Sequence, residues 1–228
     1  MRSWITGLAL AALSTVSGLA AAAMVYTPLA TPLTTPDNPE GGNFDGTGVW
    51  FNPLTGYAEV RGYWFPDQLY EDGKFFLFRN TAYAEPEAEI YVQGFFSRGN
   101  GVIYESAGNL NPARYDVGTV IGPGTGYQSP GAGYSDLGPT FGNWAAGDRG
   151  FLGLTMRDPS GASSSDVFYG FADITVNEDY SITLNAFAYE NVRGAAITTV
   201  LSPVPEPASA ALLALGLAGV LGLARRRR

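Results

Sequence analysis

The chain contains neither cysteine nor histidine, so its chemistry rests on carboxylates, tyrosine, lysine and arginine. This composition excludes thiol nucleophiles, histidine-based catalytic triads, and zinc sites with thiolate or imidazole ligands. Glu85, Glu87 and Glu89 alternate along one segment and would point to one side of an extended chain. Such a row could bind Ca²⁺ through its oxygens. We favour a solvated edge whose charges resist strand-on-strand aggregation.

Further acidic side chains fall in or near expected turns: Asp158, Asp166, Asp173, Glu178 and Asp179. We expect no cofactor and keep a structural Ca²⁺ ion bound among them as the alternative, which no Asp-x-Asp-x-Asp-Gly spacing supports. A glycoside hydrolase would need two carboxylates facing each other across a cleft. We therefore expect no enzymatic activity and keep a carboxylate-based glycoside hydrolase as a remote alternative.

Aromatic side chains offer a second kind of chemistry, because exposed rings can stack on sugars. Most aromatic residues favour strands and should lie in the core or in cross-strand pairs. Residues 108–150 hold eleven glycines and show no helical or alternating period, which predicts a long loop or loosely stranded insertion. Because such a loop should leave some rings exposed, the candidate glycan contacts are Trp144, Tyr127 and Tyr134.

The rest of the chain between the termini reads as short strands separated by turns, with no convincing amphipathic helix. This pattern predicts an all-β fold, a β-sandwich or jelly roll, over residues 45–202, preceded by an extended leader at residues 24–44. Two hairpins are expected, the first around the turn at residues 52–56 and the second around residues 97–101. Further strands are expected at residues 74–78, 151–156, 167–176, 180–189 and 195–201.

Charge limits the partners of this region. Residues 24–204 hold 8 basic and 20 acidic residues, a net charge of −12. Such an excess of negative charge argues against nucleic acid or anionic lipid as a partner. Without disulfides, the domain must depend on its core or on bound ions.

The N-terminal residues 1–23 resemble a secretory signal. Arg2 supplies a basic start, residues 4–19 are mostly apolar, and small residues follow. We expect cleavage by signal peptidase near Ala22 or Ala23 after export through the Sec translocon. An uncleaved N-terminal helix is the alternative.

The C-terminal residues combine three features. Pro205, Glu206 and Pro207 form a short acidic motif whose prolines favour an extended backbone. Residues 208–224 carry no charge, and as a helix they would be just long enough to span a bilayer. A terminal cluster follows, and its position predicts that the cluster stays on the cytoplasmic side: Arg225, Arg226, Arg227 and Arg228.

The order and spacing of these features resemble the PEP-CTERM sorting signal of exosortase substrates in Gram-negative bacteria. The resemblance implies recognition by an integral-membrane cysteine transpeptidase, cleavage near the motif, and release or attachment at the cell surface or in an exopolysaccharide matrix. An ordinary C-terminal anchor that is never cut is the alternative. Segments at residues 150–154, 169–171 and 188–190 also resemble the C-terminal half of many PEP-CTERM ectodomains, a resemblance that implies no active site.

These observations lead to one main hypothesis. The chain is a non-enzymatic protein of the cell surface or extracellular matrix, held briefly in the inner membrane and then processed by an exosortase-like enzyme. The alternative from another class is a lectin-like carbohydrate-binding module that contacts exopolysaccharide.

Overall fold

The structure is a computed structural model of the 228-residue chain. It describes residues 23–36, 47–62, 74–80, 87–92, 100–106, 109–128, 134–138, 143–157 and 167–202. These residues form strands and turns, with no helix among them, and their sheets are open. The described part therefore confirms the all-β prediction, while both predicted terminal helices lie outside the described residues.

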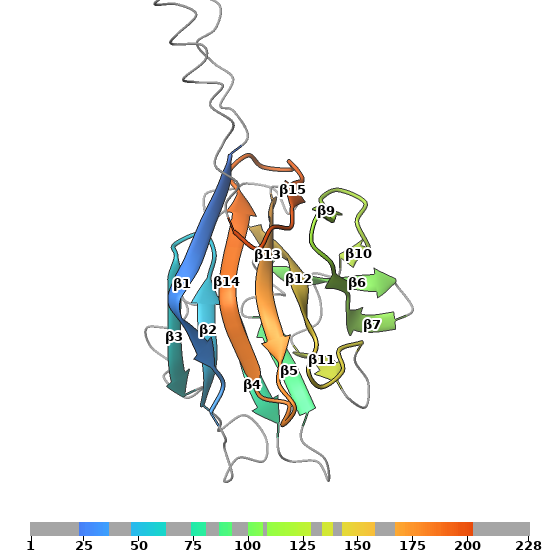
Figure 1. Ribbon diagram of the computed structural model, residues 1–228. Helices are drawn as coiled ribbons and strands as arrows, with labels where there is room; N and C mark the ends of the chain where they lie inside the picture. Colours follow the sequence, from blue (N-terminus) through green and yellow to red (C-terminus); the bar gives the residue numbers. More distant parts are fainter. Residues whose placement is uncertain are drawn as a thin grey trace, which may run out of the picture.

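The larger sheet has eight strands. Its main path runs in the order β1 (Met24–Thr34), β14 (Ile182–Glu190), β13 (Val167–Val176), β12 (Arg149–Arg157), β6 (Gly101–Ser106) and β10 (Tyr127–Gln128). Two short strands lie off this path, β7 (Asn109–Pro112) beside β6 and β8 (Arg114–Tyr115) beside β12. The pairs along β12, β13 and β14 are antiparallel, so the three segments with the family-like pattern are neighbours in one sheet (Figure 1).

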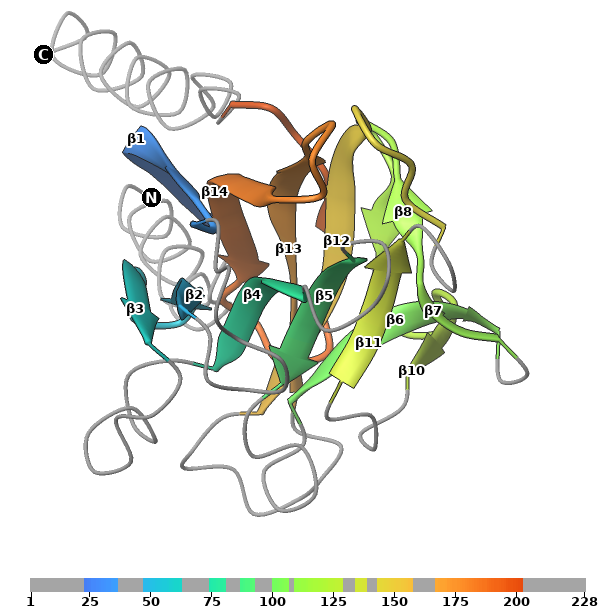
Figure 2. The ribbon, with the colours of Figure 1, turned by 90° about the horizontal axis from the view of Figure 1, so that it is seen from below.

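The smaller sheet has five strands. They run in the order β11 (Tyr134–Gly138), β5 (Glu87–Val92), β4 (Phe75–Asn80), β2 (Thr47–Asn52) and β3 (Tyr57–Gly62). A separate two-stranded ladder joins β9 (Val120–Ile121) to β15 (Ile197–Thr198). Figure 2 shows β4, β5 and β11 lying across from β12, β13 and β14.

The two sheets share one apolar core, which gives the fold its sandwich-like arrangement. Phe51 of β2 meets Phe187 of β14 with ring centroids 5.7 Å apart. On β14, Ile182 and Leu184 belong to this core. The strict alternation of a strand then sends the side chains between them to the outer face of the larger sheet.

The predicted leader is only partly separate from the domain. Its first part is strand β1, which pairs with β14 from Met24↔Glu190 to Thr34↔Thr183. The folded domain therefore begins at Met24 rather than at residue 45. β1 lies at the end of the sheet order, where proline is tolerated because an edge strand needs hydrogen bonds on one side only. Pro28 and the irregular register after it fit that position.

The first predicted hairpin is confirmed and the second is wrong. β2 and β3 pair around residues 53–56, as the turn signal indicated. β5 and β6, however, join different sheets, so the chain crosses from one layer to the other between them. The glycine-rich segment at residues 108–150 contains the short strands β7 to β11 and the start of β12.

A second apolar cluster lies on the outer face of the larger sheet. It contains Phe151, Phe171 and Ala188 from the sheet, with Ile121 of β9 and Ile197 of β15 packed on them. The β9–β15 ladder therefore covers part of this face and leaves the rest of it to polar side chains.

Candidate functional site

The part of the larger sheet's outer face that no described element covers carries a row of polar residues that crosses four strands. Arg149 of β12 is the register partner of Thr175 of β13. Thr175 is in turn opposite Thr183 of β14, and Thr183 is opposite Thr34 of β1. We call these four residues, together with Asn185 two positions after Thr183 on β14, the polar stripe. Arg149 and Thr34 are exposed, and the other three side chains are half-buried.

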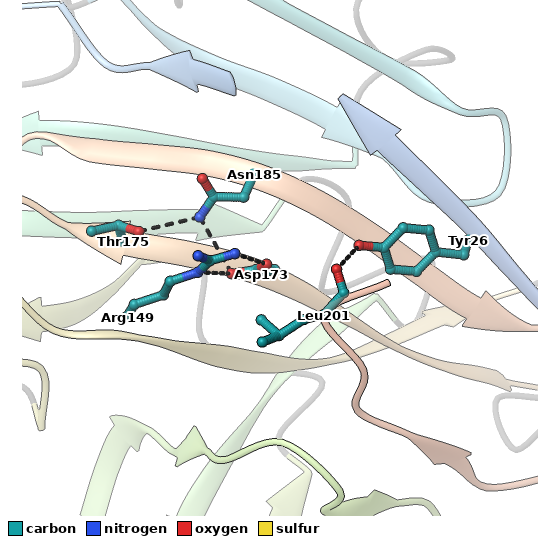
Figure 3. A network of polar contacts seen from close by, with 6 residues as sticks. All are labelled: Tyr26, Arg149, Asp173, Thr175, Asn185 and Leu201. Atoms are coloured by element: carbon teal, nitrogen blue, oxygen red, sulfur yellow. Dashed lines mark hydrogen bonds and ion pairs between the residues drawn. The ribbon is translucent and has the colours of Figure 1, made fainter. Parts of the chain in front are cut away.

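Side-chain hydrogen bonds join the polar stripe from strand to strand. The hydroxyls of Thr34 and Thr183 lie 2.8 Å apart. The Asn185 amide nitrogen donates to Thr175 Oγ1 at 3.2 Å and to Asp173 Oδ1 at 3.3 Å (Figure 3). These cross-strand bonds fix the outward groups of four separate strands relative to one another.

Asp173 anchors one end of this network. Its carboxylate is 1% exposed. It accepts two hydrogen bonds from Arg149, from Nε at 3.0 Å and from Nη2 at 2.8 Å. Hydrogen bonding to Asp173 raises the pKa of the Arg149 guanidinium. The buried carboxylate thus holds a guanidinium whose side chain is 52% exposed.

A second feature is the C-terminal strap, which we define as residues 191–202. Thr199, fully buried, donates its hydroxyl to the Asp116 carbonyl at 2.6 Å and accepts from the Thr119 backbone N–H at 3.0 Å. The Tyr26 hydroxyl donates to the Leu201 carbonyl at 2.8 Å (Figure 3). Burial raises the pKa of Tyr26, and the nearby Asp173 charge adds to this effect. The strap is therefore tied to the domain up to Leu201.

The start of the described chain lies beside the base of the strap. The Ala23 backbone N–H donates to Asn191 Oδ1 at 3.1 Å, and the Asn191 N–H donates to the Ala23 carbonyl at 3.2 Å. Glu190 is buried and accepts a hydrogen bond from the Val192 N–H at 3.3 Å. Both ends of the domain therefore emerge from the same end of the larger sheet.

Of the aromatic glycan contacts predicted from the sequence, the described side chains include Trp144 alone, and its position does not fit that role. Trp144 is 1% exposed and belongs to the core between the sheets, with its backbone N–H bonded to the Leu137 carbonyl at 2.8 Å. The prediction assumed an exposed loop ring, but this segment folds back against β11 and buries it. Tyr127 and Tyr134 lie on β10 and β11, and their side chains are outside what the structure describes.

The favoured interpretation of the alternating glutamates is wrong for the two described members. Glu87 and Glu89 are 2% and 4% exposed, because β5 is an inner strand between β4 and β11 rather than an edge. Glu89 accepts a hydrogen bond from the Asn80 amide at 2.7 Å. Glu85 lies outside the described residues.

No three acidic side chains of the described part come close enough together to hold a metal ion. Asp173 is bound to Arg149, Glu178 and Asp179 are exposed in the turn after β13, and Asp158 and Asp166 are outside the described residues. The expectation of no cofactor and its alternative, a structural Ca²⁺ ion, both stay predictions. The described part also contains no helix with the length and apolarity needed to cross a membrane.

The sequence analysis did not predict the polar stripe, although the pattern of its two β14 residues can be recognised in the sequence. Apolar and polar residues alternate from Ile182 to Asn185, so a strand there would place Ile182 and Leu184 on one face and Thr183 and Asn185 on the other. The register that brings Arg149 and Thr34 beside them depends on pairings between distant segments, which a single sequence does not specify.

The described residues thus define a sandwich-like all-β domain with a tied-down strap at its C-terminal end. Directly after that strap, a family model described as the PEP-CTERM protein-sorting motif matches residues 203–228. The chain therefore carries a PEP-CTERM motif, as its resemblance implied. No curated protein and no solved structure matches the chain.

The motif implies export, a membrane-anchored sorting signal at the C-terminal end, and recognition by an exosortase. The motif thus implies an exosortase-sorted secreted protein. Its motif residues Pro205, Glu206 and Pro207, and the terminal arginines at residues 225–228, lie outside the described residues.

Proposed function

We propose that this protein is a non-enzymatic component of the cell surface or the exopolysaccharide matrix. A signal peptide at residues 1–23 directs it to the Sec translocon, and signal peptidase removes that segment. The C-terminal segment holds the chain briefly in the inner membrane, and an exosortase-like transpeptidase then cuts near Pro205, Glu206 and Pro207.

The observation that carries this proposal is the match to the sorting motif directly after a folded domain. Two features of the domain support it. The β1 strand starts at Met24, immediately after the expected signal-cleavage region. The acidic, cysteine-free composition also suits a protein that must stay soluble after export.

Mass spectrometry of the protein from producing cells tests the proposal. We expect a mature chain that starts near Ala23 and lacks residues 208–228. Replacement of Pro205, Glu206 and Pro207 by alanine should leave the longer, membrane-bound form. A secreted wild-type chain that retains residues 208–228 would refute processing.

Carbohydrate binding is the second candidate function, and the polar stripe is the observation that favours it. The polar stripe replaces Trp144 as the candidate carbohydrate site, because the Trp144 ring is buried in the core and cannot contact a polymer.

A further inference from the structure

The polar stripe has hydrogen-bonding groups left over after its internal bonds are made. Asn185 uses both amide hydrogens, on Asp173 and Thr175, which leaves its Oδ1 as an acceptor. Figure 3 shows that oxygen turned away from both partners. Arg149 uses Nε and Nη2 on Asp173, and Thr175 accepts from Asn185 while its own hydroxyl hydrogen stays available. Within the described part of the chain, no hydrogen bond uses Asn185 Oδ1 or Arg149 Nη1.

These leftover groups are held in fixed positions. Each belongs to a side chain that is already bonded to a neighbour on another strand, so little rotamer freedom remains to be lost on binding. The leftover groups lie on β12, β13 and β14 and so span two strand-to-strand spacings, which is about 10 Å at 4.8 Å each. Two donors, Arg149 Nη1 and the Thr175 hydroxyl, beside one acceptor, Asn185 Oδ1, fit a ligand with many hydroxyl groups, because each hydroxyl can both donate and accept.

The charges of the stripe and of the surrounding domain limit which polar ligands can bind. Arg149 and Asp173 neutralise each other, while residues 24–204 carry a net charge of −12. An anionic polymer would meet repulsion from the whole domain. A protein partner is disfavoured as well, because the buried centre of a protein interface is normally rich in apolar and aromatic side chains. A neutral polyhydroxylated chain has neither disadvantage.

We propose that the polar stripe is a binding site for a neutral polysaccharide. Arg149 Nη1 and the Thr175 hydroxyl donate to sugar oxygens, and Asn185 Oδ1 accepts from a sugar hydroxyl. The proposal rests on the extracellular location in the proposed function, which is where such a polymer would be met.

Affinity electrophoresis in native gels tests this site. The protein purified from producing cells is run in gels that contain hydroxyethyl cellulose, dextran or galactomannan, with alginate as the anionic comparison. We expect retardation in at least one neutral gel and none in alginate. The double variant Thr175→Val/Thr183→Val keeps the side-chain shape and removes two hydroxyls. The double variant should bind about three- to tenfold more weakly than the wild type, which corresponds to the loss of one net hydrogen bond.

Thr198→Val is the matched control, because Thr198 is exposed on β15, away from the stripe, and undergoes the same chemical change. It should migrate like the wild type. Thermal unfolding identifies any variant that has lost its fold, and the single variant Thr175→Val, which breaks fewer internal bonds, then takes the place of the double one.

Three results would overturn the site: no retardation of the wild type in any of the three neutral gels, stronger retardation in alginate, or equal retardation of folded stripe variants and wild type. The readout does not depend on C-terminal processing. A failure here would therefore leave the mass-spectrometric test of sorting unaffected, and the reverse also holds.

Discussion

At the scale of single residues, the Arg149–Asp173 pair joins two groups in unequal surroundings. The Asp173 side chain is 1% exposed, whereas that of Arg149 is 52% exposed. If Asp173 is neutralised, water can still hydrate the guanidinium. If Arg149 is neutralised, a carboxylate stays buried with the Asn185 amide as its remaining hydrogen-bond partner among the described residues. Removal of the Arg149 charge should therefore lower the free energy of unfolding more than removal of the Asp173 charge.

We expect Arg149→Gln to lower the free energy of unfolding by about 2–3 kcal/mol and Asp173→Asn by about 1 kcal/mol. Urea denaturation of the two variants and of the wild type measures both values. The double variant should cost less than the two single changes added together, because the interaction is lost only once. A larger loss for Asp173→Asn would contradict this account of the pair.

A second residue-scale prediction concerns Asp179 in the turn between β13 and β14. Its Oδ1 accepts from the Ser181 hydroxyl at 2.7 Å and from the Ser181 N–H at 3.1 Å. The hydroxyl bond is the main cause of a pKa below the usual value. Because the folded-state pKa is lowered, the stabilisation is present above the unfolded-state pKa, near 3.8. It is lost as the pH falls through the folded-state pKa.

We therefore expect Asp179→Asn to be less stable than the wild type at pH 7 and almost equal to it once the pH is well below 3.8. Thermal unfolding across this range measures the difference. Glu178→Gln, a neutralisation at the exposed neighbouring position, serves as the control. A stability difference that is unchanged by acid would show that the charge of Asp179 plays no part.

At the scale of elements, one buried hydroxyl contributes to holding the strap, beside the backbone bonds that join Thr199 to Gly118 and Thr119. Thr199→Val keeps the shape of the side chain but leaves the Asp116 carbonyl and the Thr119 N–H without the bonds that Thr199 Oγ1 now makes. We expect a loss of about 1–3 kcal/mol, with faster amide exchange at Gly118 and Thr199. Thr198→Val, one residue earlier and exposed, should leave exchange there unchanged. Equal exchange in the two variants would mean that the Thr199 hydroxyl is not needed, and that the backbone bonds of Thr199 to Gly118 and Thr119 and the Tyr26 bond to Leu201 hold the strap.

The elements also show where sequence patterns succeed and where they fail. β13 has the predicted bounds, residues 167–176, because its aromatic and β-branched residues favour a strand and the turns on both sides of it are clear. β1 was missed as part of the sheet, since its prolines and threonines resemble a linker and its partner β14 lies far along the chain. Glu87 and Glu89 were placed on an edge because their charge suggests solvent, but strand order, which the sequence does not reveal, makes β5 an inner strand.

The candidate sites also differ in how much of each the sequence can predict. The sorting motif is contiguous, so its residue types and order were enough to identify it. The polar stripe draws one residue or two from each of four strands, and it exists only after the register has been set. The burial of Trp144 likewise follows from the packing of its segment against β11, which local composition did not indicate.

At the scale of the whole molecule, the domain and its sorting motif are very close together. The Leu201 carbonyl is tied to Tyr26, and Pro205 lies four residues further along the chain. Four extended residues reach at most about 14 Å. Any enzyme that acts at the motif must therefore work next to the folded domain, or the strap must first detach.

This geometry leads to a prediction about processing. Insertion of Gly-Ser-Gly-Ser between Ser202 and Pro203 should double the reach of that segment without altering the fold, and it should speed conversion to the shorter chain. Tyr26→Phe, which removes the hydrogen bond to Leu201, should act in the same direction but more weakly, because the Thr199 contacts stay in place. Pulse-chase labelling in cells with an active exosortase measures the rate of conversion. Slower or unchanged conversion in both variants would show that the docked strap does not limit access, and that the enzyme accepts the motif with the folded domain directly beside it.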